Sequence, residues 1–284
     1  MNSIERMFKR ADYLKRTCGV TAWFKISEQG MTRHEVLSQA SAAAVSNKSG
    51  SELWLFTSSH VVQPWRWRNY YPQEWIDFVR PEHCKYTLEI RDDKTGTVME
   101  TYRLDSDSLV SHPTRDVARL SLKADDEITW NKNKSRPIES VAFSKKELCV
   151  NDNVVVCGHA VEEFEYDSRE SDLQNMHSMM GGDFHREDYS CYDSAAGDAG
   201  LRFQMPRAVM DSHFIACVGQ QSFLQTGNYV LVDGMCGGPV LDLEDPNICH
   251  GLIEGIVPLQ NPTHLAGCAA FIDSTELANW EKWK

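Results

Sequence analysis

The segment from Gly234 to Pro239, GMCGGP, sets a nucleophilic thiol, Cys236, among glycines. Gly234 permits a tight turn that can aim backbone N–H groups into the space in front of the thiol. Gly237 and Gly238 carry no side chains, so a substrate backbone can approach closely. The pattern predicts a nucleophile beside an oxyanion hole, which is the arrangement that acyl transfer requires.

Two further motifs offer the acid–base groups that activate a thiol. In WLFTSSHVV, His60 follows an apolar strand that ends in small polar residues. In DVARLSL, Asp116 stands at the head of an alternating segment. The chain order is histidine, aspartate, nucleophile, as in chymotrypsin-type enzymes. A lone cysteine is more often a core residue and a lone aspartate is common in turns, but the three motifs in this order favour a catalytic interpretation.

Most of the chain consists of short segments rich in β-branched and aromatic residues, bounded by Gly, Asp, Asn or Pro, which predict strands. These segments are Val20–Ile26, Ser51–Phe56, Tyr86–Arg91, Val98–Leu104, Val117–Leu122, Asn153–Cys157, Leu201–Val209, Asn228–Val232, Pro239–Leu243, Gly251–Val257 and Gly267–Ile272. Many short strands with few helices predict a sandwich or barrel. A short helix is expected at each end of the chain. Asp273 can cap the second helix, and Glu276 sits where it would complete a capping box.

Two long stretches interrupt this pattern. Residues 63–83 are dense in Trp, Tyr, Phe and Pro, and residues 160–200 are acidic and rich in Met and Gly. Interleaved Arg and aromatic residues at 65–71 could stack single-stranded bases. On so acidic a chain, a packed lid or a protein docking site is the favoured interpretation of 63–83. The acidic part of 160–200 is expected to be a solvated surface loop.

Composition narrows the class of protein. The net charge of −12 argues against duplex nucleic acid as a partner, and no apolar run approaches the ~20 residues that cross a bilayer. The first residues carry no secretory signal; they resemble a mitochondrial targeting helix only in part, because Glu5 and Asp12 are acidic. Nine scattered cysteines without a C-x-x-C pair predict reduced thiols. We therefore expect an intracellular protein that is not secreted, in the cytosol rather than the mitochondrion, and no metal or other cofactor is implied.

Several motifs carry a family resemblance. TSSHVV (57–62) and DVARL (116–120) resemble the histidine and aspartate motifs of trypsin-like and HtrA-like proteases. Gly234–Pro239 resembles their nucleophile motif with Cys in place of Ser, as in picornavirus-type cysteine proteases. Gly251–Val257 looks like the strand that lines the substrate pocket, and Gly267–Ile272 looks like the last barrel strand.

The resemblance runs from about residue 20 to residue 272 and implies an all-β fold of two packed six-stranded antiparallel β-barrels, as in chymotrypsin. On this reading the first barrel spans 20–135 and carries His60 and Asp116. The second spans 136–272, carries Cys236 and contains the insertion at about 160–200. Residues 1–19 and 273–284 supply the N-terminal and C-terminal helices.

The resemblance also implies a role for each residue. Cys236 would attack the scissile carbonyl, His60 would take up the thiol proton and later protonate the leaving amine, and Asp116 would orient the imidazole. The backbone N–H groups of Gly234 and Cys236 would stabilise the oxyanion. Met235 stands where secreted trypsins carry an aspartate, so activation by N-terminal cleavage is not expected.

The same resemblance locates a substrate pocket. Val230 would form its floor, Val257 and Cys268 would stand near its walls, and Gly267 would leave it open. Pro258 would lie on the strand that pairs with the substrate, where it keeps its carbonyl but lacks the N–H. With no charge at these positions we expect an apolar preference, and the glutamine specificity of viral relatives is not carried over.

Two functions follow. The first is a cysteine endopeptidase that cleaves polypeptides through a Cys-His-Asp triad. The second is a catalytically silent trypsin-like pseudoprotease that serves as a binding or structural subunit of a complex, since the fold alone does not prove activity. An active enzyme needs Cys236 within hydrogen-bond reach of His60 and an open cleft. A scaffold would show that cleft filled by the aromatic segment or by residues 160–200, or occupied by a partner protein.

Overall fold

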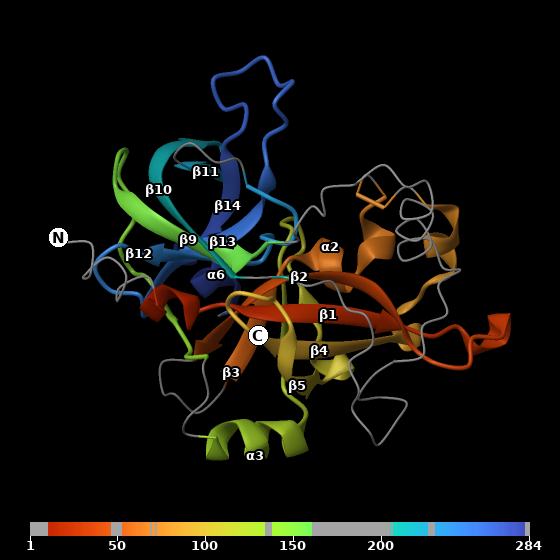
Figure 1. Cartoon of the computed structure of the whole chain (residues 1–284). Helices are drawn as coiled ribbons and strands as arrows, with labels where there is room; N and C mark the ends of the chain where they lie inside the picture. The colour runs from red at the N-terminus through yellow and green to blue at the C-terminus, as the bar shows by residue number, and fades with distance from the viewer. Residues whose placement is uncertain are drawn as a thin grey trace.

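A computed structural model gives the fold of the chain. It describes residues 11–46, 53–68, 70–71, 73–133, 138–160, 205, 207–226 and 231–281. In these parts the chain forms two seven-stranded sheets that pack beside each other, the first in red to yellow and the second in green to blue (Figure 1). The all-β, two-barrel prediction is confirmed.

The first sheet has the strand order β5-β4-β1-β2-β3-β7-β6. Its strands are β1 (Cys18–Phe24), β2 (Glu35–Ser46), β3 (Leu53–Thr57), β4 (Cys84–Arg91), β5 (Val98–Leu104), β6 (Val110–Ser111) and β7 (Ala118–Ser121). An antiparallel bridge between Leu104 and Leu122 brings the end of β5 against the residue that follows β7. This contact curls the sheet around a core in which Val20, Leu55 and Leu88 are buried.

The second sheet has the order β12-β9-β10-β11-β14-β13-β8, and β12 also pairs with β13. Its strands are β8 (Ala142–Phe143), β9 (Asn153–His159), β10 (Arg207–Val218), β11 (Gln221–Thr226), β12 (Pro239–Asp242), β13 (Ile248–Ile256) and β14 (Ala269–Asp273). The β12–β13 pairing closes six antiparallel strands into a barrel, which removes the exposed edges. Each sheet thus holds a seventh strand beyond the predicted six, and both extra strands, β6 and β8, are two residues long.

The two barrels share an apolar interface. Phe56 of β3 and Val45 of β2 lie in one buried cluster with Val155, Leu252 and Trp280 of the second half of the chain. The middle of β2 is a run of three alanines, all buried, so the second barrel can approach this strand closely. The sequence prediction missed β2, because Ala and Ser are not typical strand residues.

Helical segments are short. They are α2 (Ser59–Val62), α3 (Ala124–Lys132), α6 (Ser274–Glu281) and the 3-10 turns η1 (Ser27–Gln29), η2 (Pro64–Arg66), η3 (Glu74–Phe78), η4 (Pro81–His83) and η5 (Ser106–Ser108). Residues 11–14 form one further helical turn before β1. Asp273 caps α6 as predicted, accepting from the N–H groups of Thr275 and Glu276. The predicted capping box is wrong, because the Glu276 carboxylate pairs with Arg115 instead.

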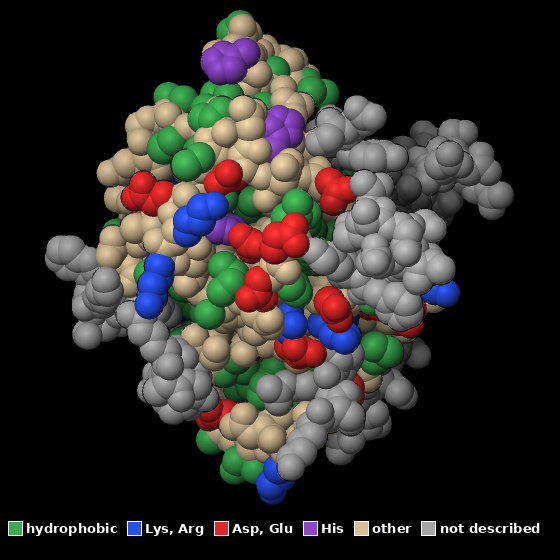
Figure 2. Space-filling model, turned by 90° about the vertical axis from the view of Figure 1, so that its left-hand side faces the viewer, with side chains coloured by type: hydrophobic (Ala, Val, Ile, Leu, Met, Phe, Trp, Pro, Cys, Tyr) green, Lys and Arg blue, Asp and Glu red, His purple; other side chains and the backbone are tan. Residues whose placement is uncertain are grey.

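Parts of the sequence prediction fall outside the described residues. These parts are the proposed loop from 161 onward, residues 201–204 and 228–230 of two predicted strands, and the first ten residues. Val232, which was predicted to end a strand, lies in a non-strand segment. Among the helices that the structure describes, none is long and apolar enough to cross a membrane. On the face shown in Figure 2, acidic and basic side chains are intermixed, and the described part of that face shows no extended basic patch.

Candidate active site

His60 is placed by a turn of helix that follows β3 directly. Its helix, α2, is fully buried, and both of its last carbonyls are held by side chains: Ser38 Oγ donates to Val61, and Tyr86 donates to Val62 at 2.8 Å. The backbone N–H of His60 donates to Asp116 Oδ1 at 2.8 Å. The imidazole therefore stands on a backbone that neighbouring strands fix on several sides.

His60 lies between a carboxylate and a thiol. Its Nδ1 is 2.5 Å from Asp116 Oδ2, and both side chains are buried. Burial by itself would lower the pKa of His60, but hydrogen bonds to Asp116 and to the half-buried Cys236, together with their negative charges, raise it to about 10. The site thus favours a protonated imidazole facing a thiolate at neutral pH. The structure brings together the three side chains that the sequence singled out.

The backbone around Cys236 turns its carbonyls away from the space in front of the thiol. Gly234 has a φ of 89°, and its carbonyl accepts a hydrogen bond from Ser41 Oγ at 2.6 Å. The Ser41 N–H donates to the Cys236 carbonyl at 3.2 Å, and Gly238 N–H donates to Met235 at 3.0 Å. Among the described residues, the N–H groups of Gly234 and Cys236 have no hydrogen-bond partner. Two donors are therefore available beside the thiol.

Gly237 fixes the loop against both barrels. Its φ is 81°, a left-handed conformation that favours glycine, and its N–H donates to Ile253 of β13 at 2.8 Å. A Cβ at this position would lie 2.4 Å from the carbonyl oxygen of Ser41 and 2.8 Å from Thr57 Oγ1. Only a residue without a side chain fits here, so this glycine serves the close approach of two backbones.

Behind Asp116 stands a buried ion pair that joins the barrels. Arg115 binds both carboxylate oxygens of Glu254 on β13, at 3.0 and 2.6 Å, and also pairs with Glu276 of α6. Glu254 Oε1 accepts from the backbone N–H of Asp116 at 3.2 Å, and Gln221 donates to Oε2 at 2.9 Å. The Asp116 backbone is thus held by the second barrel through Glu254. The sequence analysis missed this pair; its signal was a carboxylate within the otherwise apolar strand at 251–257.

The predicted pocket residues lie together, with one exception. Val257 N–H donates to the Cys268 carbonyl at 2.9 Å, and Gly267 N–H donates to Val257 at the same distance. Val257 is half-buried and Pro258 is exposed, whereas the Cys268 side chain is fully buried beside Phe223 and Leu265. Val230 lies outside the described residues.

The aromatic segment packs on the triad. The Tyr70 ring is stacked on the His60 imidazole, with centroids 4.6 Å apart and planes 4° apart. Trp67 meets the same imidazole edge-on with centroids at 6.5 Å, and Tyr71 lies at 6.3 Å. Residues 63–83 were predicted to be a lid or docking site, and this part of them lies directly against His60.

Comparison with known proteins places the architecture. No family model and no curated protein matches the chain. Among solved structures it is similar to the crystal structure of the Rv3671c protease from M. tuberculosis in its active form, with a TM-score of 0.50 and 13% identity over 95% of this chain and 81% of that chain. The chain has a trypsin-like protease fold. A likeness at this identity concerns the fold alone, so the chemistry of the trypsin-like fold here has to be argued from the chain's own side chains.

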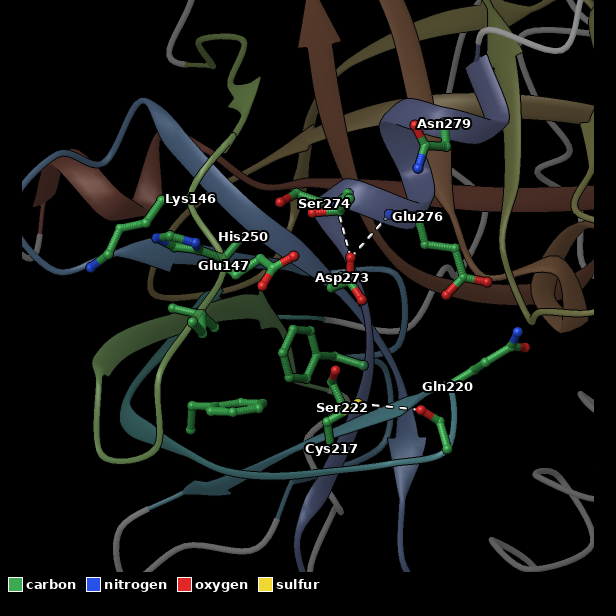
Figure 3. A pocket seen from close by; sticks show the side chains of 15 residues that line it. Lys146, Glu147, Cys217, Gln220, Ser222, His250, Asp273, Ser274, Glu276 and Asn279 are labelled. Carbon is green, nitrogen blue, oxygen red and sulfur yellow. Dashed lines mark hydrogen bonds between the residues drawn. The ribbon is translucent and has the colours of Figure 1, made fainter.

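A separate cavity of about 490 Å³ opens on the second barrel, and none of the triad residues lines it. Figure 3 shows Glu147, Asp273 and Glu276 around it, together with His250. Glu276 and the backbone of Gln220 also contact Arg115 from this side. Among the described residues, no group of three or more His, Cys, Asp and Glu side chains is arranged to hold a metal ion.

Proposed function

We propose that the chain is a cysteine endopeptidase in which Cys236 is the nucleophile, His60 the general base and acid, and Asp116 the group that orients His60. The observation that carries the proposal is the position of the His60 imidazole, 2.5 Å from Asp116 on one side and hydrogen-bonded to Cys236 on the other. The trypsin-like fold supports a peptidase-type function in general. The cysteine chemistry rests on the residues of this chain.

The reaction follows from the geometry. The Cys236 thiolate adds to the scissile carbonyl carbon, and the oxyanion that forms accepts hydrogen bonds from the N–H groups of Gly234 and Cys236. The His60 imidazolium then gives its proton to the leaving amine as the carbon–nitrogen bond breaks, which leaves a thioester. A water, deprotonated by His60, hydrolyses the thioester and restores the thiol. Asp116 accepts from Nδ1 throughout and so holds the tautomer that this sequence needs.

The rival function is a silent scaffold, and the Tyr70 contact with His60 gives it a specific observation. The two functions differ in the reactivity of Cys236. The test is alkylation by iodoacetamide at about pH 6.5, with every thiol followed by mass spectrometry. The chain supplies its own reference in the exposed thiols Cys149 and Cys217.

We expect Cys236 to react about 10- to 100-fold faster than the two reference thiols, because an ordinary thiol with a pKa of about 8.5 is only about 1% ionised there. The advantage should disappear in His60→Ala while the reference rates stay unchanged. Equal labelling of the three thiols, unaffected by His60→Ala, would instead favour the scaffold. Cleavage of an unfolded protein substrate by the wild type, and none by Cys236→Ala, completes the test of peptidase activity.

A further inference from the structure

Tyr70 spans the groove beside the triad. Its ring covers one face of His60, on the first barrel, and its hydroxyl lies 3.4 Å from the point where a Cβ on Gly255 would stand. Gly255 belongs to β13, on the second barrel, and directly follows Glu254. One side chain of the aromatic segment therefore reaches from the catalytic histidine to the strand that faces it.

The backbone that carries Tyr70 is locally tied. The N–H groups of Tyr70 and Tyr71 both donate to the Trp67 carbonyl, at 2.9 and 3.2 Å, and Arg68 donates to the Gln73 carbonyl at 2.7 Å. The ring itself is about half exposed, at 51%. One face of the ring thus rests on His60 while the rest borders solvent, as expected of a wall of a binding groove.

An extended peptide bound at Cys236 has to present side chains to both barrels in turn, because successive side chains of a strand point to opposite sides. The side chain of the acylated residue would point to the second barrel, toward Val257 and Gly267. The side chain of the residue before it would then point to the first barrel, toward the face of His60. Tyr70 already occupies that face.

On the basis of the proposed function, we propose that Tyr70 is a specificity-determining residue that restricts the position before the acylated residue to glycine or alanine. The preferred substrates are polypeptides in which a small residue precedes an apolar one at the cut. Tyr70 fills the space beside Gly255, so a branched side chain at that position has to displace the ring or lose contact with the groove.

The test uses two chloromethyl ketone probes, acetyl-Ala-Ala-Gly-Leu and acetyl-Ala-Ala-Val-Leu, and the rate of Cys236 modification by mass spectrometry. In the wild type, the glycine probe should react about 10-fold faster or more, the range that steric exclusion from a pocket supplies. In Tyr70→Ala the ratio should fall to within about 3-fold, through a faster reaction of the valine probe. Phe78→Ala is the matched control, since Phe78 is an exposed aromatic of the same segment, and it should keep the wild-type ratio.

Equal rates for the two probes in the wild type, or an unchanged ratio in Tyr70→Ala, would overturn the proposal. If Tyr70→Ala accelerates both probes and iodoacetamide to the same extent, Tyr70 is a lid without selectivity, which also overturns it. Binding separates this proposal from the proposed function. Calorimetry of the two parent peptide amides with Cys236→Ala should show tighter binding of the glycine peptide whether or not the thiol is activated, and equal binding would count against the role of Tyr70.

Discussion

The supporting side of His60 and its substrate side are built from different materials. On the supporting side, Asp116, Glu254 and Arg115 are all buried, and their hydrogen bonds join the two barrels. On the substrate side, Tyr70 is half exposed and touches the imidazole through a single ring contact. The comparison teaches that geometry and selectivity are separable here. Changes on the supporting side should cost stability, whereas changes on the substrate side should alter reactivity with little cost to folding.

The sharpest break of this comparison is Arg115→Met. It leaves the Glu254 and Glu276 carboxylates without their cation in a buried site, so we expect the free energy of unfolding to fall by about 3–5 kcal/mol. Lys146→Met is the matched control, because Lys146 forms an exposed pair with Asp152 and should cost no more than about 1 kcal/mol. Urea unfolding of both variants measures the difference. Similar losses would show that the Arg115 pair has no special structural part.

Gly237→Ala tests the contact between the nucleophile loop and the first barrel. The left-handed backbone and the close approach of the Ser41 carbonyl should together cost roughly 2–4 kcal/mol. Gly30 has a similar φ of 86° with nothing within 4 Å, so Gly30→Ala should cost only about 1–2 kcal/mol. Thermal unfolding of the two variants separates the crowding from the backbone conformation. A larger loss for Gly30→Ala would contradict this description of the loop.

The pH dependence of stability reports the protonated state of His60. Its pKa is raised to about 10 in the folded chain, above its ordinary value of about 6.5, so the folded chain holds more protons between these limits. The stabilisation is complete below about pH 6.5 and is lost as pH rises toward 10, with a slope of up to about 1.4 kcal/mol per pH unit. Between about pH 7 and 9, the wild type should lose stability more steeply than His60→Asn. Parallel curves would mean that His60 is neutral in the folded state.

The smallest effect on stability is expected on the substrate side. Tyr70→Ala removes an exposed ring, and its free energy of unfolding should change by about 1 kcal/mol or less. The rate of iodoacetamide labelling at Cys236 should remain within about 3-fold of wild type, because iodoacetamide carries no peptide side chains. A large loss of stability in this variant would place Tyr70 with the supporting side and undo the comparison.

The chemistry-bearing residues could be predicted from the sequence because short motifs carry them. His60 follows an apolar strand, Asp116 opens one, and Cys236 stands among glycines, so each has a local pattern. The strand β2 has no such pattern, since its serines and alanines become buried only when the second barrel packs on them. The pairing of Arg115 with Glu254 joins residues far apart in the sequence, and only the closed barrels bring them together. Tyr70 was predicted as part of an aromatic segment, but its stacking on His60 depends on how that segment turns.

The central claim is that Cys236 is held as a thiolate by His60, and the pH–rate profile of its alkylation tests this most directly. Iodoacetamide labelling would be followed at Cys236, Cys149 and Cys217 in the same samples between about pH 5.5 and 8. The account predicts a nearly flat, fast profile for Cys236, whereas the two exposed thiols should accelerate about tenfold per pH unit, because their thiolate fraction rises with pH. A Cys236 rate that rises in parallel with the two reference thiols would contradict the account.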